Sequence, residues 1–441
     1  MITLLAFLFV LGVLIFVHEL GHFLAARRHG VRVLTFSLGF GPKILKVTRG
    51  DTEYCISAVP LGGYVKMAGE NPEDPRSGQP DEFLSKTKWQ RFQILFAGPA
   101  MNIILAVVVT AFVLGAQGVR VPVYVDGPAL LGAVVPGSPA ERAGLMPGDR
   151  ITNVAGDTIA TWKDLEIAIG IRRPNRDLSV TAIRNGQTIN STVRPVAEGK
   201  YESSEIGVLP DANPLITRVI AGDRAEQAGL KAGDIILAVN GARMATRPQL
   251  IDVISQHGGK PIQITVRRGT SEVTVAATPE QRGARGWLGV ELSEPTKSFT
   301  PGPFEAVKLS VEHNIESSGL IFRTLAGLFT GETSVRQLQG PVGIAQLSGE
   351  SAQEGFITLL SLMAMLSINL GILNLMPVPV LDGGHILIMA LEGIARRDFS
   401  MQVKEKMLLA GFVVLMMLMV TVIYNDLTRI SWIERLMPWR N

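Results

Sequence analysis

Long apolar segments alternate with polar stretches along this chain, and they predict four membrane helices. The segments are residues 1–26, 92–116, 356–395 and 407–424. About 20 apolar residues in a helix cross the ~30 Å hydrocarbon core of a bilayer. A cleaved signal peptide is the rival interpretation of the first segment, but residues 1–17 lack the basic start of such peptides. We therefore expect the first segment to stay in the membrane.

Basic residues flank the apolar segments and predict their direction. Arg27 and Arg28 follow the first segment, and Arg396 lies between the third and fourth. Because Lys and Arg accumulate in cytoplasmic loops, we expect four crossings with both termini outside. Residues 27–91 then lie in the cytoplasm, and the tail of residues 425–441 lies outside.

Residues 27–91 alternate apolar and polar positions, with glycine at the bends. This pattern predicts short strands of a membrane-associated β region. A sheet close to the first membrane helix would offer an edge to which an extended peptide could add. An ordinary cytoplasmic β-hairpin is the alternative.

Residues 119–292 mix charged, polar and apolar positions as a soluble domain does, and one motif occurs in them twice. The pattern A-x-x-A-G-L-x-x-G-D-x-I begins at Ala140 and again at Ala225. It resembles bacterial PDZ domains and predicts two tandem modules, residues 119–204 and 205–292. Such modules bind extended peptides by strand addition, usually at a C-terminus. Residues 206–208, I-G-V, resemble the carboxylate-binding loop of the second module.

The expected fold is thus an α-helical polytopic membrane protein with a β region and two extracytoplasmic PDZ domains of the α+β class. Residues 301–350 mix apolar and charged positions at helical spacing. This mixture predicts amphipathic helices that lie at the membrane interface.

Composition agrees with a protein that is partly in lipid, because 47% of the residues are hydrophobic, 18% are charged and the mean hydropathy is +0.28. The single cysteine, Cys55, excludes a disulfide framework and a Cys-rich zinc site. Any metal must therefore use histidine and carboxylate. The net charge of +3 reflects basic residues beside apolar segments, so we expect no nucleic-acid binding.

Candidate chemistry lies at the end of the first apolar segment, in an H-E-x-x-H pattern at residues 18–22. Residues four apart share a helix face, so His18 and His22 can aim two imidazoles at one metal ion, and the pattern suits zinc. Glu19 could take a proton from a water that the metal polarises. A chance pattern or packed histidines are the alternative, but ionisable groups within a membrane helix are functional candidates by default.

A second polar segment lies at the cytoplasmic end of the third membrane helix. It is N-L-M-P-V-P-V-L-D-G-G-H, residues 374–385, and the expected topology brings it to the depth of H-E-x-x-H. A hydrolytic zinc needs three protein ligands and one open position. Asp382 can be the third ligand, and His385 is its rival. Pro377 and Pro379 break the helix, which membranes tolerate only inside protein or beside a water-filled cavity.

The second apolar segment contains A-G-P-A-M-N at residues 97–102, which puts small residues where close helix packing would need them. Asn102 could hydrogen-bond to the metal site. It could equally join two helices, which is the commoner role of such residues.

In combination, these motifs resemble the site-2 protease family of intramembrane zinc metalloproteases, in its bacterial branch that regulates the sigma-E stress response. The resemblance covers essentially the whole chain. It implies that His18, His22 and Asp382 hold zinc and that Glu19 is the catalytic base. Other positions match family segments that are implicated in holding substrate or form the β region: Asn374, Pro377, Pro379, Gly62, Gly63 and Tyr64.

The resemblance further implies regulated intramembrane proteolysis in the bacterial inner membrane. Substrates would be single-pass membrane proteins, such as an anti-sigma factor already trimmed outside or a remnant signal peptide. The PDZ pair would act as a size filter in the periplasm, where both termini would also lie, and could bind peptide C-termini. The active site would lie near the cytoplasmic side, with membrane lipid around it.

Two other classes of function are alternatives. A membrane-anchored PDZ scaffold or chaperone would use the metal site structurally. A metal transporter would need further intramembrane His or carboxylate ligands along a path, and the sequence offers none beyond this one cluster.

Overall fold

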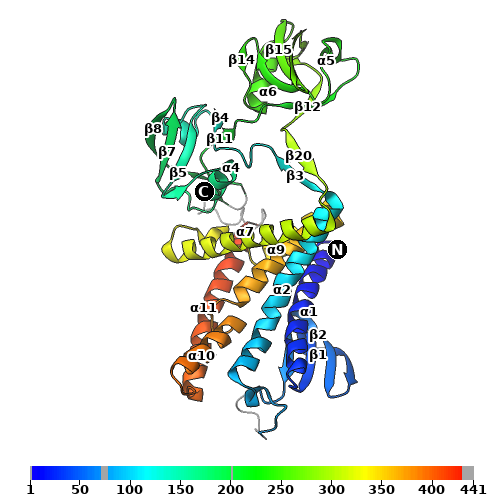
Figure 1. Ribbon diagram of the computed structural model, residues 1–441, viewed down its shortest axis with the longest axis vertical. Helices are drawn as coiled ribbons and strands as arrows, with labels where there is room; N and C mark the ends of the chain where they lie inside the picture. Colours follow the sequence, from blue (N-terminus) through cyan, green and yellow to red (C-terminus); the bar gives the residue numbers. More distant parts are fainter. Residues whose placement is uncertain (1, 71–77, 200–201, 430–441) are drawn as a thin grey trace. The chain divides into compact units, whose positions relative to one another are not determined.

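The computed structural model describes residues 2–70, 78–199 and 202–429, and the chain divides into two compact units. The helical unit comprises Met1–Gly118, Thr300–Ala326 and Leu338–Asn441. The sheet unit comprises Val119–Phe299 and Gly327–Gln337. Figure 1 traces the elements of each unit along the chain. Most of the tail expected outside, residues 430–441, falls outside the described residues.

Within the described part of the chain, four helices are long and apolar enough to cross a membrane, as the hydrophobic pattern predicts. They are α1 (Ile2–Arg28), α2 (Lys88–Gln117), α9 (Phe356–Asn374) and α11 (Met401–Thr428). Helix α2 packs against both α1 and α9. Buried side chains such as Val10, Val109 and Leu360 fill the space between these three helices, so α2 is the central helix of the unit.

The expected third segment, residues 356–395, consists of two helices. Helix α9 ends at Asn374, and α10 (Asp382–Ile394) begins after a turn. Gly383 and Gly384 allow this fold, because Cβ atoms there would lie only 2.2 and 2.1 Å from carbonyl oxygens of the turn. Any side chain would force α10 away from the turn. The two glycines thereby fix Asp382 at the first residue of α10.

Helices α7 (Pro303–Thr330) and α8 (Pro341–Glu354) occupy the segment expected at the membrane interface, residues 301–350. Helix α7 exposes apolar side chains such as Phe304 and Ile315, as an interfacial helix would. Helix α8 instead packs against α1 and α9 inside the helical unit. A Cβ on Gly349 would lie 2.5 Å from Thr3 Oγ1, so small residues let α8 approach α1. The amphipathic pattern did not predict these contacts of α8 with α1 and α9, and the interfacial location of both helices stays a prediction.

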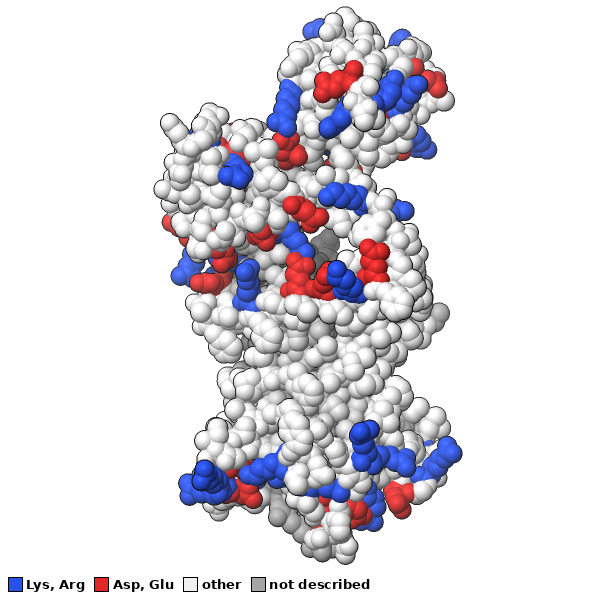
Figure 2. Space-filling model, in the orientation of Figure 1, with Lys and Arg blue, Asp and Glu red and all other residues white. Residues whose placement is uncertain are grey.

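Strands β1 (Val33–Arg49) and β2 (Thr52–Met67) form the expected sheet. Both strands bend, so residues 33–38 pair with 53–56 on one side and with 63–67 on the other. Residues 63–67 are therefore an edge of the described sheet. Figure 2 shows few charged side chains on the drawn face of the middle of the helical unit, and many basic ones at the end that carries this sheet.

The sheet unit contains two modules of the same construction and a two-stranded ribbon. The ribbon pairs β3 (Val119–Pro122) with β20 (Thr296–Phe299). The first module comprises β4 (Leu131–Val134), α3 (Pro139–Arg142), β5 (Arg150–Val154), β6 (Asp157–Thr158), α4 (Trp162–Gly170), β7 (Leu178–Arg184), β8 (Gln187–Val193), β9 (Val196–Glu198), β10 (Ser203–Glu205) and β11 (Val208–Pro210). The second comprises β12 (Leu215–Val219), α5 (Arg224–Gln227), β13 (Ile235–Val239), β14 (Ala242–Arg243), α6 (Arg247–Gln256), β15 (Ile262–Arg268), β16 (Ser271–Ala277), β17 (Glu280–Arg282), β18 (Arg285–Trp287) and β19 (Val290–Ser293).

The structure corrects the boundary between the PDZ modules. Residues 206–208 belong to the first module, because β11 pairs with β4 and Gly207 O accepts the Val135 N–H at 2.9 Å. The corresponding loop of the second module is residues 288–290, where Gly289 O accepts the Ile220 N–H at 2.9 Å. Each loop lies near the C-terminal end of its module. The expected limits of 119–204 and 205–292 therefore assign the last residues of the first module to the second.

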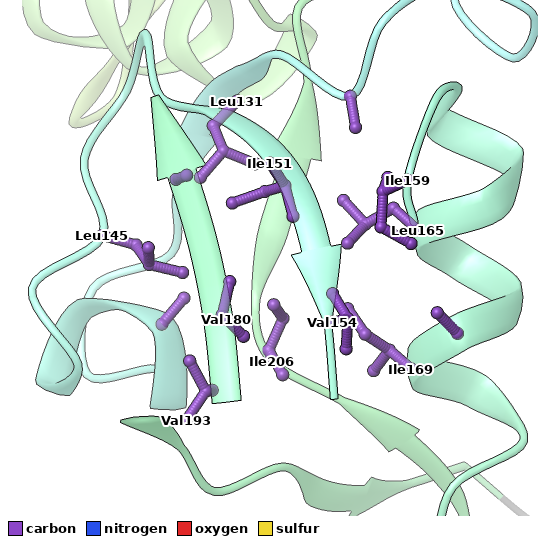
Figure 3. Packing of buried hydrophobic residues seen from close by; sticks show 14 of the residues in the cluster. Leu131, Leu145, Ile151, Val154, Ile159, Leu165, Ile169, Val180, Val193 and Ile206 are labelled. Atoms are coloured by element: carbon purple, nitrogen blue, oxygen red, sulfur yellow. The ribbon is translucent and has the colours of Figure 1, made fainter. Parts of the chain in front are cut away.

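Each module has its own hydrophobic core. In the first, Leu165 and Ile169 of α4 face buried residues of the strands, and Ile206 lies among them (Figure 3). This position of Ile206 gives a second reason to assign the loop of residues 206–208 to the first module. In the second, Ile236, Leu250 and other fully buried side chains form an equivalent core.

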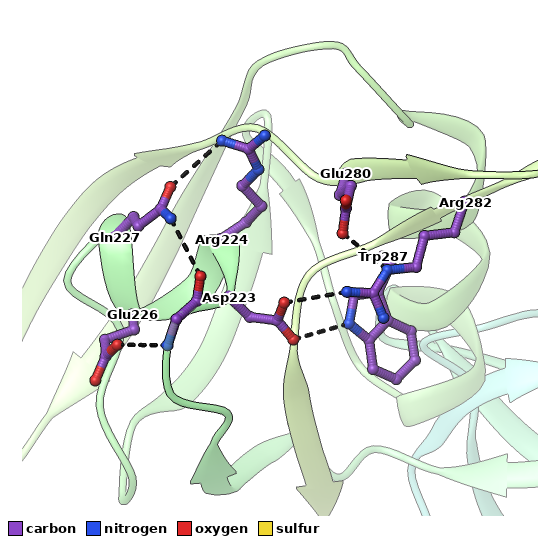
Figure 4. A network of polar contacts seen from close by, with 8 residues as sticks. Asp223, Arg224, Glu226, Gln227, Glu280, Arg282 and Trp287 are labelled. Carbon is purple, nitrogen blue, oxygen red and sulfur yellow. Dashed lines mark hydrogen bonds and ion pairs between the residues drawn. The ribbon is translucent and has the colours of Figure 1, made fainter.

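A polar network surrounds the loop of the second module (Figure 4). The Asp223 carboxylate accepts hydrogen bonds from Trp287 Nε1 at 3.0 Å and Arg282 Nη2 at 3.2 Å. The Arg282 guanidinium lies 5.0 Å from the centre of the Trp287 ring. Arg282 and Trp287 line a groove of about 350 Å³ between α6 and β19. The first module has Ser138 in place of Asp223, so the two loops differ in charge.

The repeated G-D pair of the sequence motif has a structural role in both modules. Asp149 and Asp234 are fully buried, and each binds one arginine through two nitrogens, Arg184 and Arg268 respectively. Burial alone would raise the pKa of Asp234, but hydrogen bonds from Arg268 and the Lys231 N–H lower it overall. The ionised carboxylate therefore stabilises the folded module.

We predict that Asp234→Asn lowers the free energy of unfolding of the second module by about 2 kcal/mol, because it leaves buried donors without their charged acceptor. The stabilisation is present above the ordinary pKa of 3.8 and is lost as the pH falls through the lower folded value. Hydrogen exchange of β13 and β15 in the intact protein measures the loss. The matched control is Asp252→Asn at an exposed site of α6, and an equal loss there would contradict the prediction.

Candidate metal centre

Three side chains from two distant parts of the chain meet between α1 and α10. The Nε2 atoms of His18 and His22 lie 3.2 Å apart, and Asp382 Oδ2 lies 3.3 Å from His18 Nε2 and 3.5 Å from His22 Nε2. His22 is 7% and His18 9% exposed. Among the described residues, these three form the one group of His, Cys or carboxylate side chains that could hold a metal.

The triangle has the dimensions that tetrahedral zinc requires. With bonds of about 2.0–2.1 Å to nitrogen and oxygen, two ligands of a tetrahedral zinc are separated by roughly 3.3 Å. All three separations in the triangle lie close to this value. Three protein ligands leave one position for water or substrate, as in hydrolytic zinc sites. The donor set therefore fits zinc in both number and spacing.

A backbone carbonyl fixes the orientation of His22. Its Nδ1 lies 2.8 Å from the carbonyl oxygen of Ile94 in α2, which can only accept a hydrogen bond. The proton must therefore be on Nδ1, and Nε2 keeps the lone pair that a metal needs. The sequence pattern gives no sign of this contact, because the partner is a main-chain atom 72 residues away.

Asn102 in α2 orients the second histidine. Its Nδ2 lies 3.2 Å from His18 Nδ1, while its Oδ1 is buried and has no hydrogen-bond partner among the described residues. Turning the amide by 180° lets Oδ1 accept from the His18 Nδ1–H, which satisfies the buried oxygen and frees Nε2 for a metal. Asn102 thus joins α2 to α1, as expected of a helix-joining residue. Its partner in α1 is His18, so the same contact also orients a candidate metal ligand.

Glycine allows α2 to approach the histidines. A Cβ on Gly98 would lie 2.2 Å from His22 Nε2, and one on Gly21 would lie 2.3 Å from the Ala97 carbonyl oxygen. Because Cβ atoms do not approach other atoms so closely, only glycine fits at both positions. The small residues of the A-G-P-A-M-N segment therefore position the imidazole of His22 as well as packing two helices.

Glu19 lies next to the edge of the β sheet. A Cβ on Gly63 would lie 3.0 Å from Glu19 Cγ and 2.7 Å from Ile15 Cγ2. Gly63 belongs to the edge segment 63–67 described above, so this edge runs beside α1 at the level of the candidate base. Of its neighbours, Gly62 packs on the ring of Phe40, and the Tyr64 ring stacks on the same ring with 6.2 Å between centres.

The remaining sequence candidates lie around the turn between α9 and α10. Asn374 is the last residue of α9, Pro377 is exposed, and Pro379 packs against the position of Gly411 in α11. All three precede Asp382 in the chain, and no hydrogen bond joins them to the metal ligands among the described residues. His385 is exposed and lies outside the cluster of three, so the geometry favours Asp382 over its rival.

Comparison with known proteins shows similarity along nearly the whole chain. A profile of peptidase family M50 matches residues 6–418. A putative zinc metalloprotease of Vibrio cholerae is 34% identical, over 96% of this chain and 98% of its own. The regulator of sigma E protease of Salmonella typhi is 34% identical and the regulator of sigma-E protease RseP of Escherichia coli 32% identical, each with the same coverage. The similarity thus includes both units.

We predict that Gly98→Ala weakens zinc binding by about tenfold or more, the size of effect seen when the surroundings of metal ligands change. The new Cβ would displace the His22 ring from the position that the Ile94 carbonyl defines. Competition with a chromophoric chelator on the purified protein measures the affinity. Gly115→Ala in the same helix is the matched control, because nothing lies within 4 Å of its Cβ position. Equal affinities for the two variants would contradict the prediction.

Proposed function

Because the chain belongs to peptidase family M50, we propose that it is a site-2-type endopeptidase that uses zinc to cut peptide bonds within the membrane. The single observation that carries the proposal is the triangle of ligand atoms from His18, His22 and Asp382. It lies in a unit whose long helices are apolar enough to span a bilayer. Ionisable groups in such a place are costly unless they serve a function.

His18, His22 and Asp382 would hold the zinc ion, which supplies Lewis-acid chemistry when bound by polarising a carbonyl group and acidifying water. Glu19, next to His18 on α1, would act as the general base. Its carboxylate takes a proton from the attacking water and returns it to the leaving amine, so both steps of peptide hydrolysis use one group. Asn102 and the Ile94 carbonyl hold the two imidazoles in the tautomer that the metal requires.

The substrate must be presented in an extended form, because the peptide bonds of a helix are shielded by their own hydrogen bonds. The sheet edge of residues 63–67 could hold a substrate segment in this extended form. No other described strand pairs with its outer side beside Glu19, so an unwound substrate segment could add to it as a strand. The turn that contains Asn374, Pro377 and Pro379 would contact the same segment from the side of Asp382.

Substrates would be single-pass membrane proteins in the bacterial inner membrane, as the sigma-E names of the relatives suggest. An anti-sigma factor trimmed outside and remnant signal peptides are the two expected kinds. The PDZ pair and both termini would lie in the periplasm, with the catalytic residues near the cytoplasmic side. The PDZ modules would exclude substrates that still carry a bulky ectodomain, and their grooves could bind peptide C-termini.

We predict that Glu19→Gln reduces cleavage of a truncated single-pass substrate by about 10²–10⁴-fold, the usual contribution of a general base, while zinc content stays unchanged. His22→Ala should lose both activity and zinc. The measurement is cleavage in proteoliposomes with parallel metal analysis, and Glu312→Gln on the exposed face of α7 is the control. Full function in Glu19→Gln would instead favour a PDZ scaffold with a structural metal.

We also predict that removing residues 119–299 abolishes discrimination between intact and trimmed substrates. The reason is steric, because a filter acts by excluding a folded ectodomain from the membrane site. The ratio of cleavage rates for the two substrates, in the deletion variant and in the full chain, tests this. If the deletion variant cuts the trimmed substrate and still rejects the intact one, the modules are not the filter.

A further inference from the structure

The sheet unit contains a polar cavity that shares no lining residue with the groove beside the loop of the second module. Its volume is about 630 Å³. It is lined by residues of three segments: Arg173, Pro174, Asn175, Arg176, Ala197, Glu202, Ser334 and Arg336. Among the described lining residues there are three arginines and one carboxylate, so this part of the lining carries a net positive charge.

The charges of this lining are not internally cancelled. Glu202 lies 3.4 Å from Arg336 Nη1, and this ion pair is half exposed. Among the described residues, the guanidinium groups of Arg173 and Arg176 form no hydrogen bond or ion pair. Planar guanidinium groups bind phosphate oxygens in pairs, and several of them around one space are typical of phosphate recognition.

The cavity is a built feature, because the segment that closes it is fastened to the first PDZ module. Thr333 Oγ1 donates to the Ile171 carbonyl at 2.9 Å, and Gln337 Nε2 donates to the Gly170 carbonyl at 3.2 Å. The Arg173 N–H donates to the Glu332 carbonyl at 2.5 Å. These bonds hold residues 332–337 beside the end of α4 and bring Arg336 to the same space as Arg173.

The chain itself connects this segment to the membrane helices at both ends. Ser334 follows four residues after Thr330, the last residue of α7, and Leu338 already belongs to the helical unit. Four residues span at most about 14 Å when fully extended. If α7 lies at the membrane interface, as its exposed Phe304 and Ile315 favour, the cavity is within reach of lipid headgroups.

We propose that the three-arginine cavity binds the phosphate of an anionic phospholipid and so docks the first PDZ module on the membrane surface. Basic residues close to an anionic membrane surface are attracted to it, and the attraction grows with their number. The proposal rests on the membrane location of α7 and not on the proteolytic activity, so it can fail while the protease assignment stands.

The experiment uses the full chain in nanodiscs of phosphatidylcholine, with or without phosphatidylglycerol. Hydrogen exchange of residues 170–176 and 332–337 is the readout, and phosphatidylglycerol should slow it about tenfold, the effect of about 1.4 kcal/mol. Arg173→Gln/Arg176→Gln/Arg336→Gln should abolish this slowing, while β7 stays protected. The control, Arg218→Gln/Arg224→Gln/Arg267→Gln, removes the same charge from exposed sites of the second module and should keep it.

Two further arms separate the possible outcomes. Inorganic phosphate added to neutral discs tests a free anion, and slowing by phosphate without slowing by phosphatidylglycerol overturns the lipid assignment. Glu202→Gln removes the single carboxylate of the cavity and should strengthen the response to phosphatidylglycerol even if the triple variant fails to fold. Equal exchange in both kinds of disc, or an equal loss in the control variant, also overturns the proposal.

Discussion

The structure depends on one constraint, which is that charged and polar groups inside an apolar helical unit must satisfy one another. His18, His22 and Asp382 do so around a single point, with all separations between 3.2 and 3.5 Å. The outer nitrogens of the imidazoles are satisfied by α2, through the Ile94 carbonyl and the Asn102 side chain. Three helices, α1, α2 and α10, are thereby held in one arrangement by a site that would be costly without a cation.

Glycine makes this arrangement sterically possible. Gly98 and Gly21 let α2 and α1 approach until the His22 ring lies on the α2 backbone, and Gly383 and Gly384 let α10 fold back onto the preceding turn. Dispersion and short hydrogen bonds replace the hydrophobic driving force that lipid does not provide between helices. The same close packing that holds the helices together therefore also sets the distances between the ligand atoms.

The sheet unit is built differently from the helical unit, because each of its two PDZ modules has its own hydrophobic core. Each PDZ module is closed by its own loop and by its own buried aspartate–arginine pair, around its own hydrophobic core. The bent β sheet places an unpaired edge beside Glu19. The residues proposed for catalysis, substrate presentation and selection thus belong to structurally distinct elements, which are linked through the chain.

The sequence by itself determined what depends on local spacing: the four apolar helices, the strands of the β region, the PDZ repeat, and the two segments that carry His18, His22 and Asp382. Hydrophobic period and motif spacing depend on residues close together in the chain, so they can be recognised from the sequence alone. Only the tertiary structure decided which module owns residues 206–208, that α8 is packed inside the helical unit, and that Asn102 and the Ile94 carbonyl orient the histidines. These features depend on contacts between residues far apart in the chain, whose identity no local pattern encodes.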